Sequence, residues 1–212
     1  MKIKISTTIL KALLLHAGKD TGKGEKITGR EHLAGLAIEV LPNGRKAVLI
    51  ATDGARMAAV YEDVESPAGW VGSFIVPRDR LDTLCKLRNR QVSISYSGEP
   101  FDIELESNRI CVSTRPILAD FPDWRLAMPR ADAIEAPANY NPKYLQDMYA
   151  ITKAIGAIGT YRKPFTQYGT KNPGMMIIEN RAICLIMPLR DTQEPVEAVP
   201  EWAKRPADRK AA

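Results

Sequence analysis

The chain has 212 residues, of which 45% are hydrophobic and 26% are charged, a composition typical of a globular protein with one large domain or two small ones. No apolar run approaches the roughly 20 residues that a membrane-spanning helix needs, and the first residues lack the pattern of a cleaved signal peptide. We therefore expect a cytoplasmic protein without a membrane partner. The net charge of +5 and the pI near 9.1 slightly favour an anionic partner such as nucleic acid.

The first third of the chain predicts one strand, one helix and then three strands. Residues 1–6 alternate Lys with Ile as a strand does, and Thr7 or Thr8 is expected to cap a helix with an apolar face over residues 9–17. Strands follow at 33–41, 46–52 and 56–62. The Asp53-Gly54 pair between the last two predicts a hairpin, because its turn needs positive φ angles.

The same order of elements then recurs twice, as an internal repeat of architecture and not of sequence. The second module has a strand at 73–76, a helix that Pro77 opens, and a meander over 91–96, 101–106 and 109–113. The third module has a strand-like piece at 133–138, a helix capped by Asn141, and strands at 159–169, 175–179 and 182–187. Residues 191–212 are charged and rich in proline, so we expect a disordered tail, with docking of Trp202 in a neighbour's cleft as the alternative.

A proline-rich connector, Ser113 to Pro129, joins the second module to the third. Its prolines fix φ and bias the preceding residues to extended conformations, so a rigid, extended segment is expected. Phe121 and Trp124 lie between these prolines. We expect the two aromatic side chains to fill a seam between packed units.

Residue types needed for catalysis are scarce. His16 and His32 are the only histidines, and no nucleophile elbow, zinc-protease motif or glycine-rich dinucleotide motif occurs. Cys85, Cys111 and Cys184 show no CxxC spacing, so we expect buried core thiols rather than a disulfide or a zinc site. The sequence therefore predicts a binding protein without cofactor or metal, and not an enzyme.

Five segments carry a resemblance to a known family. They are A-T-D-G-A-R-M-A (51–58), F-I-V-P-R-D-R-L (74–81), I-L-A-D-F-P-D-W-R-L-A-M-P (117–129), N-P-K-Y-L-Q-D (141–147) and I-M-P-L-R (186–190). In this order the chain resembles bacterial DNA polymerase III beta subunits, the sliding clamps, from residue 1 to about residue 190. The resemblance implies an α+β DNA-clamp (processivity) fold, with antiparallel sheets on one side and helices on the other.

The resemblance also implies a division into domains. Residues 1–129 resemble the family's complete middle domain, with two modules, and residues 130–190 resemble the second half of its last domain; its first domain and the front half of its last have no counterpart in this sequence. Clamp rings contain twelve modules, so three modules per chain would close a ring with four chains whose half-domains pair. An incomplete clamp that never closes is the alternative.

In the family, clients insert a short peptide into a cleft between the middle and last domains. Carried over residue by residue, that cleft would comprise Leu33, Thr52, Gly54, Arg56, Met57, Pro122, Leu126, Ala127, Leu185, Pro188, Leu189 and Arg190. Arg56 could hold a backbone carbonyl or a carboxylate of the peptide. Two positions depart from the family: Ala55 replaces a histidine and Asp191 replaces the closing leucine, so client preference is expected to differ.

A clamp attracts the DNA backbone without reading sequence, so basic side chains on helices suffice. The candidates are Lys11, Lys19, Arg78, Arg80, Lys86, Arg88, Arg90, Lys143 and Lys153, with Arg30 and His32 in the loop where the family touches the template. The expected partners are therefore double-stranded DNA, a DNA polymerase or another protein with a clamp-binding motif, and further copies of the chain.

We expect a sliding-clamp-like processivity protein of DNA replication that encircles or rests on duplex DNA. One alternative is a clamp relative that forms no ring and acts as an adaptor or decoy for clamp-binding peptides, which a phage could encode. Another is a basic duplex-DNA binder that uses the fold without client peptides.

Overall fold

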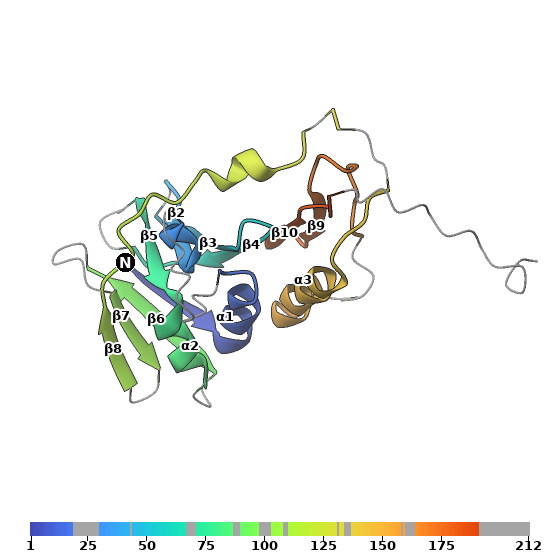
Figure 1. Cartoon of the computed structure of the whole chain (residues 1–212). Coiled ribbons are helices and arrows are strands. Elements are labelled where there is room, and N and C mark those ends of the chain that lie inside the picture. The colour runs from blue at the N-terminus through green and yellow to red at the C-terminus, as the bar shows by residue number, and fades with distance from the viewer. Residues whose placement is uncertain are drawn as a thin grey trace, which may run out of the picture.

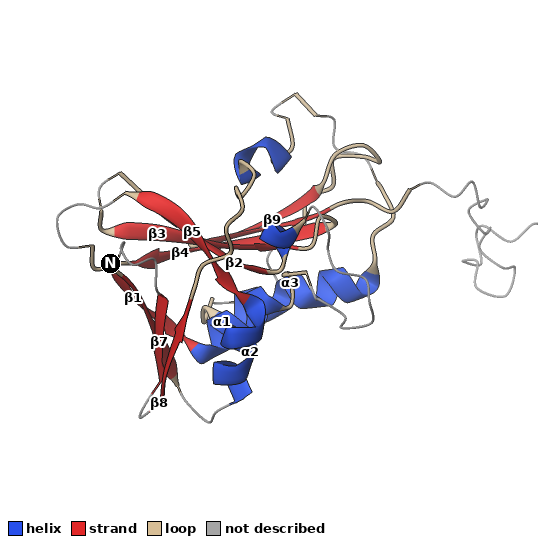
Figure 2. Ribbon diagram, turned by 60° about the vertical axis from the view of Figure 1, so that its left-hand side comes forward, coloured by secondary structure: helices blue, strands red, loops and turns tan. Residues whose placement is uncertain are grey.

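A computed structural model (Figure 1) describes residues 1–18, 30–42, 44–66, 71–86, 90–97, 103–107, 110–130, 132–133, 137–157, 159 and 164–190. The described chain forms two antiparallel sheets and three α-helices. The helices lie together in the angle between the sheets (Figure 2), and α1 packs against both α2 and α3. The α+β fold with sheets on one side and helices on the other is thus confirmed.

The elements follow one another in the order that the sequence predicts, with shifted ends. They are β1 (Lys2–Ser6), α1 (Thr7–Leu14), η1 (Glu31–Leu33), β2 (Gly35–Val40), β3 (Lys46–Thr52), β4 (Arg56–Asp63), β5 (Gly72–Pro77), α2 (Arg78–Lys86), β6 (Gln91–Tyr96), β7 (Ile103–Ser107), β8 (Ile110–Thr114), η3 (Trp124–Ala127), α3 (Pro142–Ala154), β9 (Gly174–Ile178) and β10 (Ala182–Ile186).

Four local predictions differ from the structure. The side chain of Ser6, and not Thr7 or Thr8, caps α1 by accepting a hydrogen bond from the Thr8 amide. The strand expected from residue 33 begins at Gly35, after the 3-10 turn η1. No described residue of 133–138 lies in a strand, and within 159–169 the described residues form isolated bridges only, at Thr166, which pairs with Met175, and at Tyr168. The expected tail, 191–212, lies outside the described residues.

The first two modules exchange their first strands. The four-stranded sheet has the order β1-β6-β7-β8, and the six-stranded sheet has the order β5-β2-β3-β4-β10-β9. Thus β1 of the first module pairs with β6 of the second, while β5 of the second pairs with β2 of the first. The third module contributes β9 and β10, and β10 extends the six-stranded sheet by pairing with β4.

The central strands of the six-stranded sheet are buried on both faces, whereas Ile177 on the edge strand β9 is exposed. Alternate residues of its strands, among them Ile38 and Leu49, join the helices in one large core. The intervening residues, among them Ile50 and Met57, form a second cluster on the outer face, which the connector covers (Figure 2). Because both faces are covered, β2 and β3 have continuous apolar sequences instead of alternating ones.

Hydrogen bonds fasten the connector to this outer face. The Ile117 amide donates to the Ile75 carbonyl at 2.9 Å, and Trp124 Nε1 donates to Glu39 Oε2 at 3.0 Å. Arg125 donates to both carboxylate oxygens of Glu39, at 2.8 and 3.1 Å. Burial alone would raise the pKa of Glu39, but the hydrogen bonds from Arg125 and Trp124 outweigh it and lower the pKa.

The cysteines differ in their surroundings. Cys85 and Cys184 are buried, and burial raises the pKa of their thiols to about 11 and about 12. Cys111 is exposed on β8, so the prediction of a buried thiol is wrong there. Within the described part of the chain, no helix has the length and apolar character to cross a membrane.

Substituting Trp124→Ala is expected to destabilise the fold by about 3 kcal/mol, at the lower end of the usual cost of truncating a core tryptophan, because the side chain is half-buried. It removes both apolar contact with the outer face and the hydrogen bond to Glu39. The measurement is urea unfolding. Leu126→Ala is the control, since 84% of Leu126 is exposed, and it should change stability little. Equal losses for the two variants would contradict a fastening role for Trp124.

Candidate functional site

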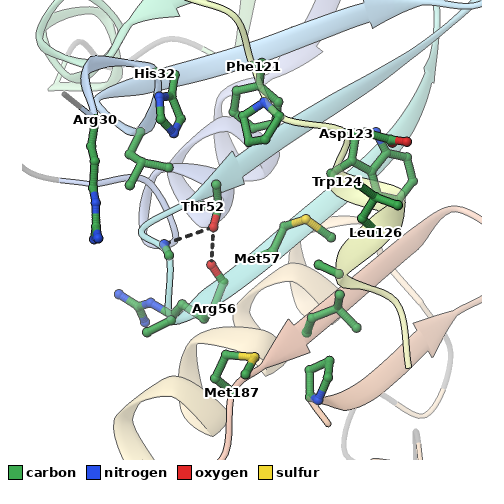
Figure 3. Close-up of a pocket in the computed structure, with 17 residues that line it drawn as sticks. Arg30, His32, Thr52, Arg56, Met57, Phe121, Asp123, Trp124, Leu126 and Met187 are labelled. Carbon is green, nitrogen blue, oxygen red and sulfur yellow. Dashed lines mark hydrogen bonds between the residues drawn. The ribbon is translucent and has the colours of Figure 1, made fainter. Parts of the chain in front are cut away.

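A cavity of about 670 Å³ opens where the connector passes the ends of β3, β4 and β10 (Figure 3). Its volume lies within the range of small-molecule and peptide-side-chain sites. The lining residues are Arg30, His32, Leu33, Thr52, Gly54, Ala55, Arg56, Met57, Phe121, Pro122, Asp123, Trp124, Leu126, Ala127, Pro173, Leu185 and Met187.

The turn between β3 and β4 forms one wall and is held by its own side chains. Thr52 Oγ1 donates to the Arg56 carbonyl at 2.8 Å and accepts from the Gly54 amide at 3.1 Å. Asp53 Oδ1 accepts from the amides of Ala55 and Arg56, both at 3.0 Å. Gly54 has a φ of 90°, which only glycine adopts readily, so the Asp-Gly sequence fits this turn.

The floor of the cavity, formed by Leu33, Met57 and Leu185, and its lip, formed by Leu126, are apolar. Met57 on β4 and Leu185 on β10 are paired in register and buried, and the buried Leu33 of η1 lines the same cavity. Leu126 of the connector is 84% exposed at the cavity wall. His32 meets Phe121 edge to face, with ring centroids 6.3 Å apart. Such a surface can receive apolar side chains of a ligand.

The side chain of Arg56 was expected to extend into the cavity, but it points elsewhere. Its Nε donates to Asp53 at 2.9 Å, Nη1 donates to Asp147 of α3, and Nη2 donates to the Leu15 carbonyl at the end of α1 at 2.6 Å. The guanidinium also lies 4.2 Å from the centre of the Tyr144 ring. The charged group is therefore engaged on the helix side of the turn.

The structure brings together nine of the twelve residues expected in the cleft, all except Pro188, Leu189 and Arg190. These three follow β10 and do not line the cavity, and the Leu189 amide donates to the Asn139 carbonyl at 2.7 Å. Seven further residues line the cavity that were not expected in the cleft: Arg30, His32, Phe121, Asp123, Trp124, Pro173 and Met187; Ala55, expected only as a departure from the family, lines it too. The proline-flanked aromatics of the connector were a usable signal for two of them; Pro173 and Met187 carry none.

The nine candidate DNA contacts that the structure describes fall into three groups. Lys11, Arg80, Lys86, Arg90, Lys143 and Lys153 are exposed on or next to the helices. Arg78 is only 11% exposed and binds Asp82 and the carbonyls of Ala17 and Gly18, so it faces inward. Arg30 and His32 line the cavity instead of the helix layer. Lys19 and Arg88 lie outside the described residues.

His16 is fully buried at the end of α1. Its Nδ1 lies 3.2 Å from the Ala12 carbonyl, and its Nε2 has no partner among the described residues. Burial lowers its pKa to about 4, although the hydrogen bond with Ala12 partly opposes this. His16 is thus a neutral core residue at neutral pH. Among the described residues, no three His, Cys, Asp or Glu side chains are grouped to hold a metal ion.

Comparison with solved structures identifies the fold as that of bacterial sliding clamps. The DNA polymerase III subunit beta from Pseudomonas aeruginosa superposes with a TM-score of 0.64 at 17% identity, over 90% of this chain and 66% of that one. The beta subunit from Thermotoga maritima superposes with a TM-score of 0.63 at 15% identity, over 91% of this chain and 66% of that one. The sliding clamp from Bacillus subtilis superposes with a TM-score of 0.63 at 16% identity, and the match covers 90% of this chain and 64% of that one.

The chain therefore spans just under two thirds of the length of the sliding clamps it resembles. No model of a known protein family matches the sequence, and no curated protein matches it either.

His16 predicts an acid-dependent loss of stability. Its pKa is about 4 in the fold and 6.5 in the unfolded chain, so below pH 6.5 the unfolded state takes up a proton that the fold does not. The free energy of unfolding should therefore fall by about 3 kcal/mol as the pH decreases from 7 to 4. Urea unfolding of the wild type and of His16→Leu across this range tests it. The free energy of unfolding should depend less steeply on pH in the variant than in the wild type. Equal pH dependence in the two proteins would contradict a buried, neutral His16.

Proposed function

We propose that this protein is a non-enzymatic, sliding-clamp-like accessory protein of cytoplasmic DNA replication. Its cavity binds short apolar peptides of partners such as a DNA polymerase, and its helix layer rests on or encircles duplex DNA. Residues 1–129 act as a complete clamp domain and residues 130–190 as half of another. The observation that carries the proposal is the cavity at the junction of these two parts, on a sliding-clamp fold.

The composition of the cavity supports peptide binding. An apolar floor under a partly exposed apolar lip suits two adjacent aliphatic or aromatic side chains of an extended peptide. The turn residues around Gly54 are fixed by internal hydrogen bonds, so little order need be imposed when a ligand binds. Pro188, Leu189 and Arg190 stay outside this proposed binding surface.

The charge on the helices supports DNA binding. Lys11 on α1, Lys86 on α2 and Lys153 on α3 are exposed, and the three helices pack side by side. Exposed lysines bind phosphates without base recognition, as a protein that slides must. We do not include Arg78 among the contacts, because its side chain is engaged within the fold.

The alternative is a clamp relative that binds peptides as an adaptor without closing a ring. Peptide binding in the cavity requires no ring, so the same cavity supports this alternative. Light scattering separates the two: a ring of four chains has four times the 23.5 kDa chain mass, whereas an adaptor remains at one chain.

Leu126→Glu should weaken peptide binding at least tenfold, because it places a charge at the apolar lip and removes a leucine contact. The substitution should not disturb the fold, since Leu126 is 84% exposed. Fluorescence anisotropy with a labelled synthetic peptide carrying adjacent leucine and phenylalanine residues measures the affinity.

The matched control is Leu118→Glu. Leu118 belongs to the same connector and is 91% exposed, but it does not line the cavity. It should leave peptide affinity unchanged. If both variants lose affinity equally, the peptide binds elsewhere.

The double variant Lys11→Met, Lys153→Met should bind duplex DNA more weakly and with a weaker salt dependence. Each lost phosphate contact lowers the slope of log K against log salt by about 1, so a change of about 2 is expected. The wild-type protein should also be retained on closed circular DNA in a salt-dependent way, and this retention should disappear when the DNA is linearised. Lys46→Met on β3, outside the helix layer, is the control and should leave the slope unchanged. An unchanged slope in the double variant would remove the helix layer as the DNA surface.

A further inference from the structure

Arg56 connects the cavity to the helix layer. Its backbone closes the turn that walls the cavity, while its guanidinium binds α1 through Leu15 and α3 through Asp147 (Figure 3 shows the side chain leaving the cavity). Only 12% of the Arg56 side chain is exposed. A displacement of α3 must therefore act on the turn, because one rigid planar group holds both.

Asp147 is the residue on α3 that holds Arg56. Its side chain is 5% exposed, and its Oδ2 accepts the Arg56 hydrogen bond. Its other oxygen, Oδ1, accepts a hydrogen bond from Lys143 Nζ at 2.8 Å. Burial alone would raise the pKa of Asp147, but the bonds from Lys143 and Arg56 outweigh it and lower the pKa. One buried carboxylate is thus shared by two cations.

The two cations have different surroundings. Lys143 is 64% exposed on the first turn of α3, whereas Arg56 is nearly enclosed. A phosphate group close to α3 competes with Asp147 for the Lys143 ammonium. When Lys143 turns to a phosphate, the charge of Asp147 is compensated by Arg56 alone, and separating this remaining buried pair becomes more costly.

We propose that Asp147 is a positioning residue that couples the helix surface to the cavity: an anion bound by Lys143 strengthens the hold of Asp147 on Arg56 and stabilises the cavity turn. This inference rests on the proposed function, because it takes duplex DNA as the anion and a peptide as the ligand of the cavity. Each ligand then increases the affinity of the other by the same factor.

Peptide affinity, measured with and without a saturating 30-base-pair duplex, tests the coupling. In the wild type, the duplex should tighten peptide binding about fivefold, within the usual range of such coupling. Lys143→Met should bind the peptide about fivefold more tightly without duplex, and the duplex should add nothing. Asp147→Asn should bind the peptide more weakly, with the same affinity in both conditions.

Lys153→Met is the matched control, since Lys153 is an exposed lysine of the same helix with no described bond to Asp147. It should weaken duplex binding but retain the fivefold tightening at saturation. Identical behaviour of Lys143→Met and Lys153→Met would overturn the proposal, because the effect would then be one of overall charge.

Hydrogen exchange of residues 51–57 separates failure of the coupling from failure of the proposed function. Exchange there should be slower in Lys143→Met than in the wild type and faster in Asp147→Asn, without any ligand. If no peptide binds but this pattern appears, the proposed function fails and the positioning role stands. If peptide and duplex bind but exchange is the same in all variants, the positioning role is refuted.

Discussion

The structure depends on covering both faces of the six-stranded sheet. The inner face packs against the helices, and the outer face would expose Ile50, Met57 and their neighbours if the connector did not cross it. The connector is fastened at Glu39 and Ile75, and it follows the sheet without forming a strand of it. Where it passes the ends of β4 and β10, the covering is incomplete, and the cavity lies there. The candidate site thus exists because the connector leaves this part of the outer face of the sheet uncovered.

The exchange of first strands explains why two modules form one unit. Neither module can complete a sheet alone, because β1 and β5 each pair with the other module. The third module has no such partner within the described residues, and it joins the first module through β10 and β4. It also supplies α3, whose Asp147 binds the turn of the first module. The sheet, the packing of α3 against α1 and the Asp147–Arg56 ion pair therefore all attach this module to the first.

Most of the architecture could be predicted from local sequence. Alternation in β6 and β7, the apolar face of α1 and the Asp53-Gly54 turn each have a local physical cause. The strand exchange could not be predicted, since both β1 and β5 would satisfy the same pattern in either sheet. The resemblance to clamps supplied the clamp fold, which comparison with solved structures confirms.

The site was predictable where its residues share a turn or a strand and not where a long-range contact decides. The expected residues Thr52, Gly54, Arg56 and Met57 lie together at the cavity, because one hairpin carries them. Arg56 and Arg78 were expected to face ligands, but partners distant in sequence, Asp147 and Ala17, hold them inward. Leu189 was expected in the cleft but does not line the cavity, and its amide is bonded to the carbonyl of Asn139, 50 residues earlier in the chain. No local pattern reports such contacts.

The strand exchange also bears on how the chain folds during synthesis. The N-terminal amine donates to the Tyr96 carbonyl at 2.7 Å, so the first strand can find its place only after about half of the chain has left the ribosome. The six-stranded sheet is complete later still, when β10 emerges. Pairings so distant in sequence form slowly and leave apolar edges exposed meanwhile. A nascent chain that ends before β10 thus lacks Leu185 in the floor of the cavity, and the cavity is complete only once β10 has emerged.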